Sequence, residues 1–487
     1  MLSSVLLSIS VLAAVAHAFP HSAFRHSLPK FKRASSSGKL VVAHHMVGNT
    51  YPYSIDNWAS DISLAHSSGL DGFALNVGSD SWQPARVADA YQAALNSNTG
   101  FKLFISFDMS SLPCTSASDA SLLRSYITNY ATHPNQLTLN GQVFASTFDG
   151  SECTFGQSSP TQGWQSQFLG QLTGSNAVHF VPAFFVDPGS FTQFNGVMDG
   201  EFNWNGGWPT TLTTSSVQAA LSSATFTNAT ENTLQAEIGT FTSDAAYVSG
   251  LNAVSGSGKT YIAAVSPWFF THYSPQTFNK NWIYLADYWS YNARWETLVN
   301  NRNQVDIVEL ISWNDYGESH YVGPIEGAQP AGTTWATGFD HSGWLAMTNY
   351  YATAFRTGQY PAITEDQLYL WARPHPKDAS ATSDPIGKPT SYELTEDKLW
   401  AVVFATAPGT VTLSSGSSTT NASVPAGVTK LSLPLTPGSG MSGTLSRNGA
   451  TVVQVAPSAS QYTFNQNPQT YNYNAFVAYA SGSGSSG

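Results

Sequence analysis

Residues 306–318 read Asp-Ile-Val-Glu-Leu-Ile-Ser-Trp-Asn-Asp-Tyr-Gly-Glu, a mainly apolar run that leads directly into a polar segment. The run 306–312 is nearly continuous in apolar residues, which is typical of a parallel strand covered on both faces. The segment after it places two acids, Asp315 and Glu318, three residues apart. A buried strand followed at once by polar side chains recurs through the part of the chain before residue 358, and this pattern predicts the fold.

Seven further runs of this kind come earlier, at residues 40–44, 72–77, 102–107, 142–148, 179–184, 197–202 and 260–265. Stretches of helical period separate most of them. After the first run, Ser54 precedes a stretch with one apolar face, and Gly69 ends it. The other helical stretches are 82–95, 120–130, 163–172, 243–251, 288–299 and 341–356. Eight strands with helical connections predict an α/β fold, a (β/α)8 barrel of the TIM type, over residues 34–358.

The pattern changes near Gly358, after which few helical stretches remain. Short strand-like runs follow at residues 399–404, 411–413, 431–435 and 452–455, and Asn448-Gly449 is a strong hairpin-turn signal. Residues 359–480 are therefore expected to form an antiparallel β-sandwich domain. This domain should dock on the barrel and contribute stability rather than chemistry, since it presents no acid pair beside aromatic residues. Residues 481–487 are expected to be a disordered Ser/Gly tail.

The N-terminus has the features of an exported protein. An apolar run at residues 2–15 is followed by the triplet Ala16-His17-Ala18, so residues 1–18 are predicted to be a signal peptide. The dibasic pair Lys32-Arg33 would end a pro-segment at residues 19–33, although such a pair also occurs as an ordinary exposed couple. No other stretch approaches the ~20 apolar residues that a membrane span needs. We therefore expect a secreted protein that acts outside the cell or in a cell wall.

Composition limits the possible partners. The formal net charge is −11, and it becomes −15 when residues 1–33, with four basic residues and no acid, are removed. An acidic chain with so few Lys and Arg is not expected to bind nucleic acid or anionic membranes. Aromatic residues make up 13% of the chain and exceed the 10% of charged residues, which suits both a large core and surfaces that stack on sugar rings. We expect a monomer whose partner is a polysaccharide substrate.

The two cysteines and two sequons agree with export. Cys114 and Cys153 are the only cysteines, and in an oxidising compartment they should pair, joining the loops after the third and fourth strands. Closing such a loop would stabilise the fold by roughly 4 kcal/mol in the chain-entropy model. Asn228-Ala-Thr and Asn421-Ala-Ser are candidate glycan acceptors, although such triplets also arise by chance.

Catalytic groups of a (β/α)8 barrel lie at the C-terminal ends of its strands, and acids, amides and aromatic residues recur there. The residues at or shortly after these ends are His44, His45, Asn76, Asp108, Asp149, Asp199, Glu201, Trp204, Trp208, Trp268, Trp313, Asn314, Asp315, Tyr316, Glu318 and His320. The sequence shows no Gly-rich phosphate loop, no serine–histidine or cysteine nucleophile pattern, and no convincing set of metal ligands. We therefore expect neither a metal ion nor an organic cofactor.

Asp315 and Glu318 are the predicted catalytic pair. Cleavage of a glycosidic bond uses two carboxyl groups, one of which stays protonated to donate to the leaving oxygen. A loop that curls directly after a buried strand can turn both acids toward the substrate from a rigid base. We assign Glu318 as the acid and Asp315 as the base that activates a water. The alternative is that both are structural carboxylates, for instance caps of the next helix.

The other residues at the strand ends are expected to contact substrate. Three acids are candidate sugar ligands with a structural role as the alternative: Asp108, Asp149 and Glu201. The two histidines of the first strand, His44 and His45, should hydrogen-bond to sugar or support such contacts rather than transfer protons. Three tryptophans are candidate stacking platforms or, alternatively, core residues: Trp204, Trp208 and Trp268. The remaining candidates for substrate contact are Asn76, Asp199, Trp313, Asn314, Tyr316 and His320.

Several runs are distinctive when taken together. They are Ala43-His-His-Met-Val-Gly48, Asp71-Gly-Phe-Ala-Leu-Asn76, Ser106-Phe-Asp-Met109, Thr147-Phe-Asp-Gly150, Asp199-Gly-Glu201, Ser312-Trp-Asn-Asp-Tyr-Gly-Glu318 and Gly338-Phe-Asp-His341. In these runs the chain resembles the fungal α-1,3-glucanases, the mutanases of glycoside hydrolase family 71. The resemblance implies inverting hydrolysis of α-1,3-glucosidic bonds in fungal wall glucan or dental mutan, with Asp315 and Glu318 in the positions of the catalytic carboxylates. An inverting pair should stand about 6.5–9.5 Å apart, leaving room for a water.

Two other interpretations stay open on the sequence alone. A glycosidase of another linkage, such as a β-glucanase, would show the same acids at its strand ends. A non-catalytic carbohydrate-binding or wall protein would show the aromatic residues. Binding alone, however, does not need two convergent carboxylates.

Overall fold

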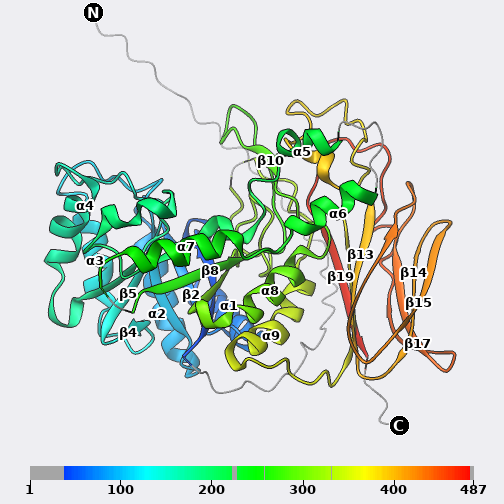
Figure 1. The fold of residues 1–487 in the computed structure, drawn as a ribbon, viewed down its shortest axis with the longest axis horizontal. Coiled ribbons are helices and arrows are strands. Elements are labelled where there is room, and N and C mark those ends of the chain that lie inside the picture. The colour runs from blue at the N-terminus through cyan, green and yellow to red at the C-terminus, as the bar shows by residue number, and fades with distance from the viewer. Residues whose placement is uncertain (1–37, 222–227, 257, 331, 483–487) are drawn as a thin grey trace, which may run out of the picture.

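The computed structural model describes residues 38–221, 228–256, 258–330 and 332–482. The expected signal peptide and pro-segment, and residues 483–487 of the expected tail, lie outside these ranges. Figure 1 shows a parallel sheet with helices around it and the antiparallel strands of the C-terminal region beside it. Within the described ranges, no helix combines the length and the apolar composition needed to cross a membrane.

Eight parallel strands form the curled sheet of this α/β fold. They are β1 (Leu40–Met46), β2 (Gly72–Val77), β3 (Lys102–Asp108), β5 (Gln142–Phe148), β6 (Val178–Val181), β7 (Gly200–Asn203), β8 (Thr260–Val265) and β11 (Ile307–Leu310). Their order is β6-β5-β3-β2-β1-β11-β8-β7, and the short β4 (Thr138–Leu139) lies antiparallel to β5. Backbone hydrogen bonds from Asp199 N to Phe180 O (2.8 Å) and from Phe202 N to Pro182 O (2.7 Å) link the two ends of this path.

Helices cover the outer face of the sheet. Six of the predicted stretches form α1 (Ile55–Ser67), α2 (Gln83–Ser97), α3 (Ala120–Tyr130), α7 (Thr242–Ala253), α8 (Ser290–Asn300) and α9 (Ser342–Thr357). The predicted ends of α1 are confirmed. Ser54 N–H donates to Asn57 Oδ1 (2.9 Å) before the first turn, and Gly69 follows the helix with a φ of 89°.

The predicted helical stretch at residues 163–172 is divided into short helical turns, and the helical prediction is incomplete after β7. The first segment is divided into α4 (Pro160–Gly163), a π-helical turn (Trp164–Phe168) and a 3-10 turn (Leu169–Gln171). Gly163 lies at this point and packs closely on the preceding loop, because a Cβ added there would lie 2.3 Å from Thr154 O. The sequence does not predict α5 (Thr214–Leu221) or α6 (Asn228–Glu237), since their Ser, Thr and Asn side chains compete for backbone hydrogen bonds.

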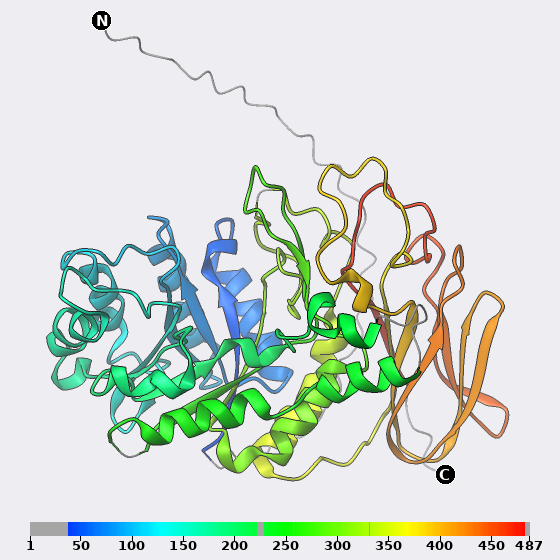
Figure 2. The same ribbon diagram turned by 45° about the horizontal axis from the view of Figure 1, so that its top comes forward.

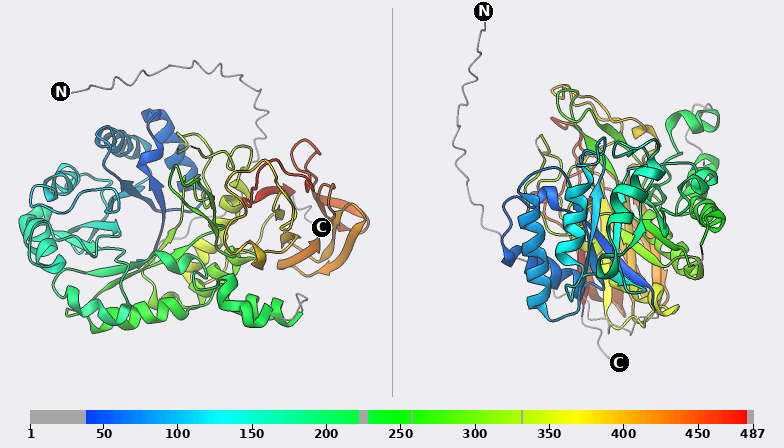
Figure 3. Two further views of the ribbon diagram at one scale, coloured as in Figure 1. Left: turned by 90° about the horizontal axis from the view of Figure 1, so that it is seen from above. Right: turned by 90° about the vertical axis from the view of Figure 1, so that its left-hand side faces the viewer.

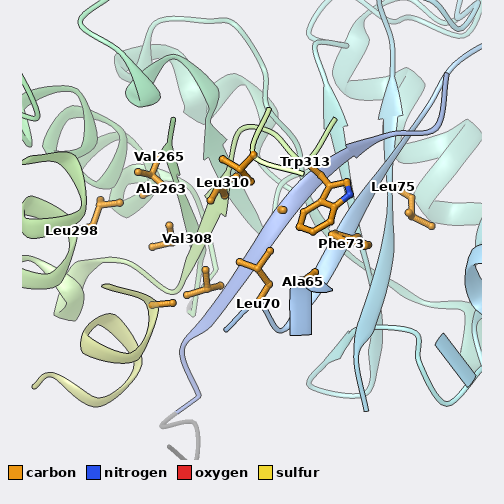
Figure 4. Close-up of a cluster of buried hydrophobic side chains, with 14 of the residues drawn as sticks. Ala65, Leu70, Phe73, Leu75, Ala263, Val265, Leu298, Val308, Leu310 and Trp313 are labelled. Atoms are coloured by element: carbon orange, nitrogen blue, oxygen red, sulfur yellow. The ribbon is translucent and has the colours of Figure 1, made fainter. Parts of the chain in front are cut away.

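Side chains of the parallel strands alternate between two apolar layers. The layer under the helices includes Phe73, Leu75, Val308, Leu310 and Trp313, all buried (Figure 4). The layer inside the curl of the sheet includes Val42, Ala74, Phe104, Phe202 and Ile262. Two neighbours on one strand therefore face different surroundings, and only those that point into the curl can reach a site there.

Two four-stranded antiparallel sheets make up the C-terminal region, in the orders β16-β13-β12-β19 and β15-β14-β17-β18. Their strands are β12 (Asp366–Ala372), β13 (Lys398–Ala405), β14 (Gly409–Ser415), β15 (Ser418–Val424), β16 (Gly427–Pro434), β17 (Ser442–Arg447), β18 (Ala450–Val455) and β19 (Phe476–Gly482). Both sheets contribute to one buried cluster, which includes Leu370, Val403, Leu413 and Leu445. The predicted turn at Asn448 and Gly449 is confirmed, with φ values of 50° and 80°.

The expected tail, residues 481–487, overlaps the last strand. Ser481 and Gly482 belong to β19 and pair with Gln367 and Asp366 of β12. Their small size explains this, because a Cβ at Gly482 would lie 2.5 Å from Val452 O of the second sheet.

The C-terminal sheets lie to one side of the parallel sheet in two turned views (Figure 2 and the left view of Figure 3). Trp268, which follows β8, is buried at the boundary between the two regions. Its Nε1 donates to Tyr473 O (2.8 Å), and the Arg373 guanidinium lies 4.4 Å from its ring centre. Arg373 also pairs with the buried Asp287 (2.7 Å). The two regions are thus joined by buried side chains, as the expected docking requires.

Candidate active site

The loop after β11 holds both predicted catalytic acids. Asn314 fixes this loop to the end of β1, because Met46 N–H donates to its Oδ1 (2.7 Å) and its Nδ2 donates to Met46 O (3.1 Å). Asp315 N–H donates to Ser312 Oγ (2.8 Å), and Glu318 N–H donates to Asp315 Oδ1 (3.1 Å). The curled loop places the two acids side by side, with 15% and 18% of their side chains exposed.

Gly317 allows this loop to approach the hairpin of β9 (Phe270–His272) and β10 (Asn281–Ile283). A Cβ at Gly317 would lie 2.1 Å from Tyr273 Oη, so no larger residue fits there. Tyr273 Oη is itself bonded to Thr333 Oγ1 (2.7 Å). Phe270 N–H donates to Glu318 O (3.0 Å). The backbone of Glu318 is therefore fixed by a second element of the fold.

Two side chains donate to the carboxylate of Glu318. Lys280 Nζ donates to Oε1 (3.0 Å), and His320 Nε2 donates to Oε2 (3.2 Å). His320 Nε2 also lies 3.7 Å from Asp315 Oδ2. His320 Nδ1 bonds to Ser312 Oγ (3.0 Å), which acts as the donor in the tautomer that this network requires. Both oxygens of Glu318 are thus held, one of them by a residue of the β9–β10 hairpin.

The surroundings separate the pKa values of the two acids. Burial raises the pKa of Asp315, and the charge of Glu318 adds to this, while His320 and Lys280 oppose it. Burial also acts to raise the pKa of Glu318, but the hydrogen bond from His320 and the charge of Lys280 outweigh it and lower this pKa to about 2. Carboxyl groups whose pKa values are pushed apart are suited to opposite roles, one as proton donor and one as ionised partner.

Asp315, Glu318 and His320 offer donor atoms that lie within 4.8 Å of one another, close enough to hold a cation. Lys280 already brings a positive charge to this group, so we interpret it as an acid–base site rather than a metal centre. An oxygen of Asp315 therefore lies within 4.8 Å of an oxygen of Glu318. This is less than the about 6.5–9.5 Å expected of an inverting pair and nearer the about 5–5.5 Å of a retaining pair.

Further residues with the predicted character face the same side of the sheet. His44 Nδ1 bonds to Glu309 Oε1 (2.7 Å), and its ring contacts Trp204 with 4.8 Å between centroids. The Trp204 centroid lies 6.4 Å from that of His320. The structure therefore brings His44, Trp204 and His320 together beside the acid pair, as the sequence predicts.

Three more candidates end strands on this edge. Burial raises the pKa of Asp108 against the hydrogen bonds from Ser110 and its interactions with His44 and Lys280, so this acid belongs to the same surroundings. Asn76 of β2 shares the inward register of Ala74 and is buried. Asp149 follows β5 and accepts from Gly150 N–H (2.7 Å).

Two candidate ligands point into the helical layer instead. His45 Nε2 bonds to Asp61 Oδ2 of α1 (3.0 Å) and is fully buried. Glu201 is fully buried and accepts from Phe184 N–H (2.7 Å), and burial raises its pKa well above the usual range. Strand alternation is the reason. His45 directly follows the inward-facing His44, and Glu201 directly precedes the inward-facing Phe202. Neither is part of the site.

Asp199 lies at the opposite edge of the sheet. The sequence predicts a strand over residues 197–202, but β7 begins only at Gly200. Asp199 therefore precedes the strand, and its Oδ2 accepts from Phe180 N–H (2.9 Å). The residues at the C-terminal end of β7 are Asn203 and Trp204, and Trp204 is the one that reaches the site.

Four further candidates are structural. Trp313 packs with Phe73 under the helices (Figure 4), and Trp268 is enclosed at the boundary between the two regions. Tyr316 Oη donates to Pro324 O (3.0 Å), and Asn314 ties its loop to β1. All four are at most 1% exposed, so substrate contact is left to their neighbours.

The predicted disulfide is confirmed. Cys114 and Cys153 are bonded with 5.2 Å between their Cα atoms. The bond joins the loop after β3 to the loop after β5, on the edge of the sheet that carries the acid pair.

Sequence reasoning misses Lys280, Phe269 and Tyr284, whereas Trp208 is one of its candidates. Tyr284 contacts Phe269 and Trp208 with centroid separations of 4.5 and 5.6 Å, and Trp208 lies 5.5 Å from His320. The one available signal is an isolated Lys within an aromatic segment. This signal does not identify Glu318 as the partner of Lys280, because the two residues are 38 positions apart in the chain.

Comparisons with known proteins show the family of the chain. The model of glycosyl hydrolase family 71 matches residues 37–487. The chain is 38% identical over 439 residues to the glucan endo-1,3-alpha-glucosidase agn1 of Schizosaccharomyces pombe, covering 88% of this chain and 94% of that protein. It is 31% identical over 468 residues to the mutanase Pc12g07500 of Penicillium rubens, covering 94% of each. It is 31% identical over 455 residues to the ascus wall endo-1,3-alpha-glucanase of S. pombe, covering 90% of this chain and 96% of that protein. The chain therefore belongs to glycosyl hydrolase family 71.

Proposed function

We propose that this protein hydrolyses α-1,3-glucosidic bonds of α-1,3-glucan through Asp315 and Glu318. The observation that carries the proposal is the partly exposed pair of acids with opposed pKa shifts, on the rigid loop after β11. Membership of the family and the names of three relatives support the linkage.

In this mechanism Asp315 is the general acid and Glu318 the ionised partner, which reverses the assignment made from the sequence. Asp315, whose pKa is raised, keeps the proton that the leaving oxygen needs. Glu318 is held as a carboxylate by Lys280 and His320 and can accept a proton from water through the second lone pairs of its oxygens. The sequence could not distinguish the two roles because Lys280 comes from another element.

Inversion is the stereochemical outcome that we propose, with Glu318 as base. The resemblance of the chain to the fungal α-1,3-glucanases, which implies inversion, supports this outcome. The close approach of the two acids favours retention instead, so the first-formed anomer decides. NMR of fresh products would show a β-anomer after inversion of an α-linkage and an α-anomer after retention. An α-anomer would make Glu318 a nucleophile rather than a base.

We propose four residues for substrate contact around this pair: Asn76, Asp108, Asp149 and Trp204. His44 and His320 are at most 1% exposed, so we propose that they support these contacts rather than make them. The chemistry described uses only protein groups and water. Trp204 is positioned to stack on a sugar ring, and Asp108 to bond to hydroxyl groups.

The activity can be tested on two polysaccharides that differ in linkage. The purified protein is incubated with insoluble α-1,3-glucan and, separately, with laminarin as a β-1,3-glucan, and released sugars are separated by chromatography. Soluble oligosaccharides should appear from the α-glucan alone. Release from laminarin alone, or from neither polymer, would overturn the proposal. The Asp315→Asn variant controls for a contaminating glucanase.

The same proposal covers architecture and location. We infer a closed (β/α)8 barrel over residues 34–358 and a β-sandwich over residues 359–480. Two hydrogen bonds between the β6 and β7 ends and the cluster shared by the antiparallel sheets support it. We also propose that the protein is secreted as a monomer, acts outside the cell or in a wall, and carries glycans at Asn228 and Asn421. Size-exclusion chromatography and mass spectrometry of the secreted protein test these points.

A further inference from the structure

Lys280 brings a positive charge to Glu318 from outside the β11 loop. Its Nζ lies 3.0 Å from Glu318 Oε1, and its side chain is 44% exposed. Burial acts to lower the pKa of Lys280, but Glu318, Asp315 and Asp108 outweigh it and raise this pKa, so the ammonium faces three acids. The cation is therefore held by the site rather than free in solvent.

The hairpin that carries Lys280 is fixed from the C-terminal region. His272 of β9 bonds through Nε2 to Asp384 Oδ2 (2.8 Å) and through Nδ1 to Asn281 Oδ1 (2.8 Å). Asn281 Nδ2 donates to the carbonyls of Gly387 and Lys388 (3.2 Å each). These contacts bind both strands of the hairpin to one segment, residues 384–390, which we call the bracing loop.

Backbone pairing adds to this attachment. Thr390 N–H donates to Asn281 O (3.0 Å), and Ile283 N–H donates to Thr390 O (3.1 Å). A single parallel bridge between Thr390 and Trp282 thus pairs the bracing loop with β10. The loop is itself held by Asp384, which accepts from Ile386 N–H (2.8 Å) and Tyr471 N–H (2.7 Å) and is 1% exposed. Lys280 directly precedes Asn281, which takes part in most of these hydrogen bonds.

We propose that Lys280 is a positioning residue for Glu318, and that the bracing loop of the C-terminal region holds Lys280 in place. This gives the C-terminal region a part in the chemistry, where the sequence suggests stability alone. The inference rests on the proposed role of Glu318. Lys280 acts through the carboxylate and does not itself touch the scissile bond.

The groups that face this carboxylate define the expected pH response. They are Asp315 and His320 on the β11 loop, Lys280 and Tyr273 on the hairpin, and Tyr284 after β10. Asp108 at the end of β3 acts on Lys280, and His44 of β1 acts on Asp108. Removal of Lys280 leaves Glu318 with one donor and with acidic neighbours. An opposite charge at this range shifts a pKa by about 1–3 units, so the acidic limb of kcat/KM should move up by about that amount when the cation is lost.

The test compares Lys280→Met with a matched variant, Lys430→Met. Lys430 pairs with Glu296 of α8 at 2.6 Å and is also partly buried, but it lies between a helix and the C-terminal sheet. Lys280→Met should lower kcat by about tenfold or more, a part of what general acid–base catalysis supplies, with KM changed by about twofold or less. Its acidic limb should shift upward, and Lys280→Arg should restore most of both. Lys430→Met should leave the pH profile unchanged.

The bracing loop is tested through Asp384→Ala. This variant should also raise the acidic limb, by less than Lys280→Met, and the double variant should behave like Lys280→Met alone, because the two changes act on one interaction. Thermal unfolding of each variant checks that it is folded. If Lys280→Met does not fold, Lys280→Gln and Asp384→Ala are read for the same limb.

The outcomes separate this inference from the proposed function. Unchanged pH limbs in Lys280→Met and Asp384→Ala, with an inactive Glu318→Gln variant, would overturn the positioning role and leave the acid pair intact. A fully active Glu318→Gln variant would overturn the proposed function itself. Additive effects of Lys280→Met and Asp384→Ala would remove the bracing loop from the inference.

Discussion

Acidic residues have different roles at the two edges of the parallel sheet. At the N-terminal edge, an acid precedes each of three strands and accepts a backbone N–H from the neighbouring strand. The bonds run from Val41 to Asp71 (2.8 Å), from Phe180 to Asp199 (2.9 Å) and from Tyr261 to Asp306 (3.0 Å). At the C-terminal edge, Asp315 and Glu318 are surrounded by the side chains of Lys280 and His320. An acid bound to strand backbone is committed to the fold, whereas one held by side chains is available for proton transfer.

The strongest test of this contrast replaces each catalytic acid by its amide. Asp315→Asn and Glu318→Gln should each lower turnover on α-1,3-glucan by about 100-fold or more, within the range of general acid–base catalysis. The amides keep the shape of the side chains, so the midpoint of urea unfolding should change little. Sugar release measured under saturating substrate gives the loss of turnover.

The two amide variants should differ in how they are rescued. An activated leaving group needs little protonation, so an aryl glycoside, if accepted, should restore Asp315→Asn. Added azide should restore activity to a variant of Glu318, because a small anion can take the place of the activated water. The opposite pattern would exchange the roles of the two acids.

The pH profile is the second test. In the proposed mechanism, activity requires Glu318 ionised and Asp315 protonated. Because the pKa of Glu318 is lowered to about 2 and that of Asp315 is raised, kcat/KM should fall below about pH 2 and again above the raised pKa of Asp315, which exceeds the usual value of about 4. Each limb should approach tenfold per pH unit. Initial rates on a soluble α-1,3-oligosaccharide measure it, and an optimum on the alkaline side of neutrality would contradict the assignment.

A smaller effect, on stability alone, is expected at the N-terminal edge. Asp199→Ala removes the acceptor of Phe180 N–H and leaves that buried donor unpaired. The cost should be about 1–3 kcal/mol in the free energy of unfolding, measured by urea denaturation, with turnover per folded molecule unchanged. A loss of turnover at full stability would show that this edge shares in the chemistry.

The smallest effect should come from Asp306→Asn. The amide oxygen can still accept from Tyr261 N–H, and the ion pair that is lost, with Lys39 at 3.6 Å, is partly exposed. We expect a change of less than about 1 kcal/mol in urea unfolding and none in turnover. The same Asp→Asn change would thus be nearly silent at one edge and disabling at the other.

Local sequence patterns predict part of the fold and of the candidate site. Apolar runs predict all eight parallel strands, and the motif after the last one predicts Asp315 and Glu318, because both signals are local. The side on which a residue points depends on register, and here His45 and Glu201 are misassigned. A strand start displaced by three residues moves Asp199 to the wrong edge. A local sequence pattern cannot predict the role of Lys280, because its contact with Glu318 forms only when the hairpin folds back on the β11 loop.

The burial of Trp268 between the two regions has a consequence for recombination among relatives. A chimera joined between α9 and β12 would take Trp268 and Asp287 from one parent and Arg373 and Tyr473 from the other. The Arg373–Asp287 pair is buried, and losing one member of such a pair costs about 3–5 kcal/mol. Functional exchange therefore requires that these four positions be inherited as a unit, which places a single crossover before Trp268 or after Tyr473.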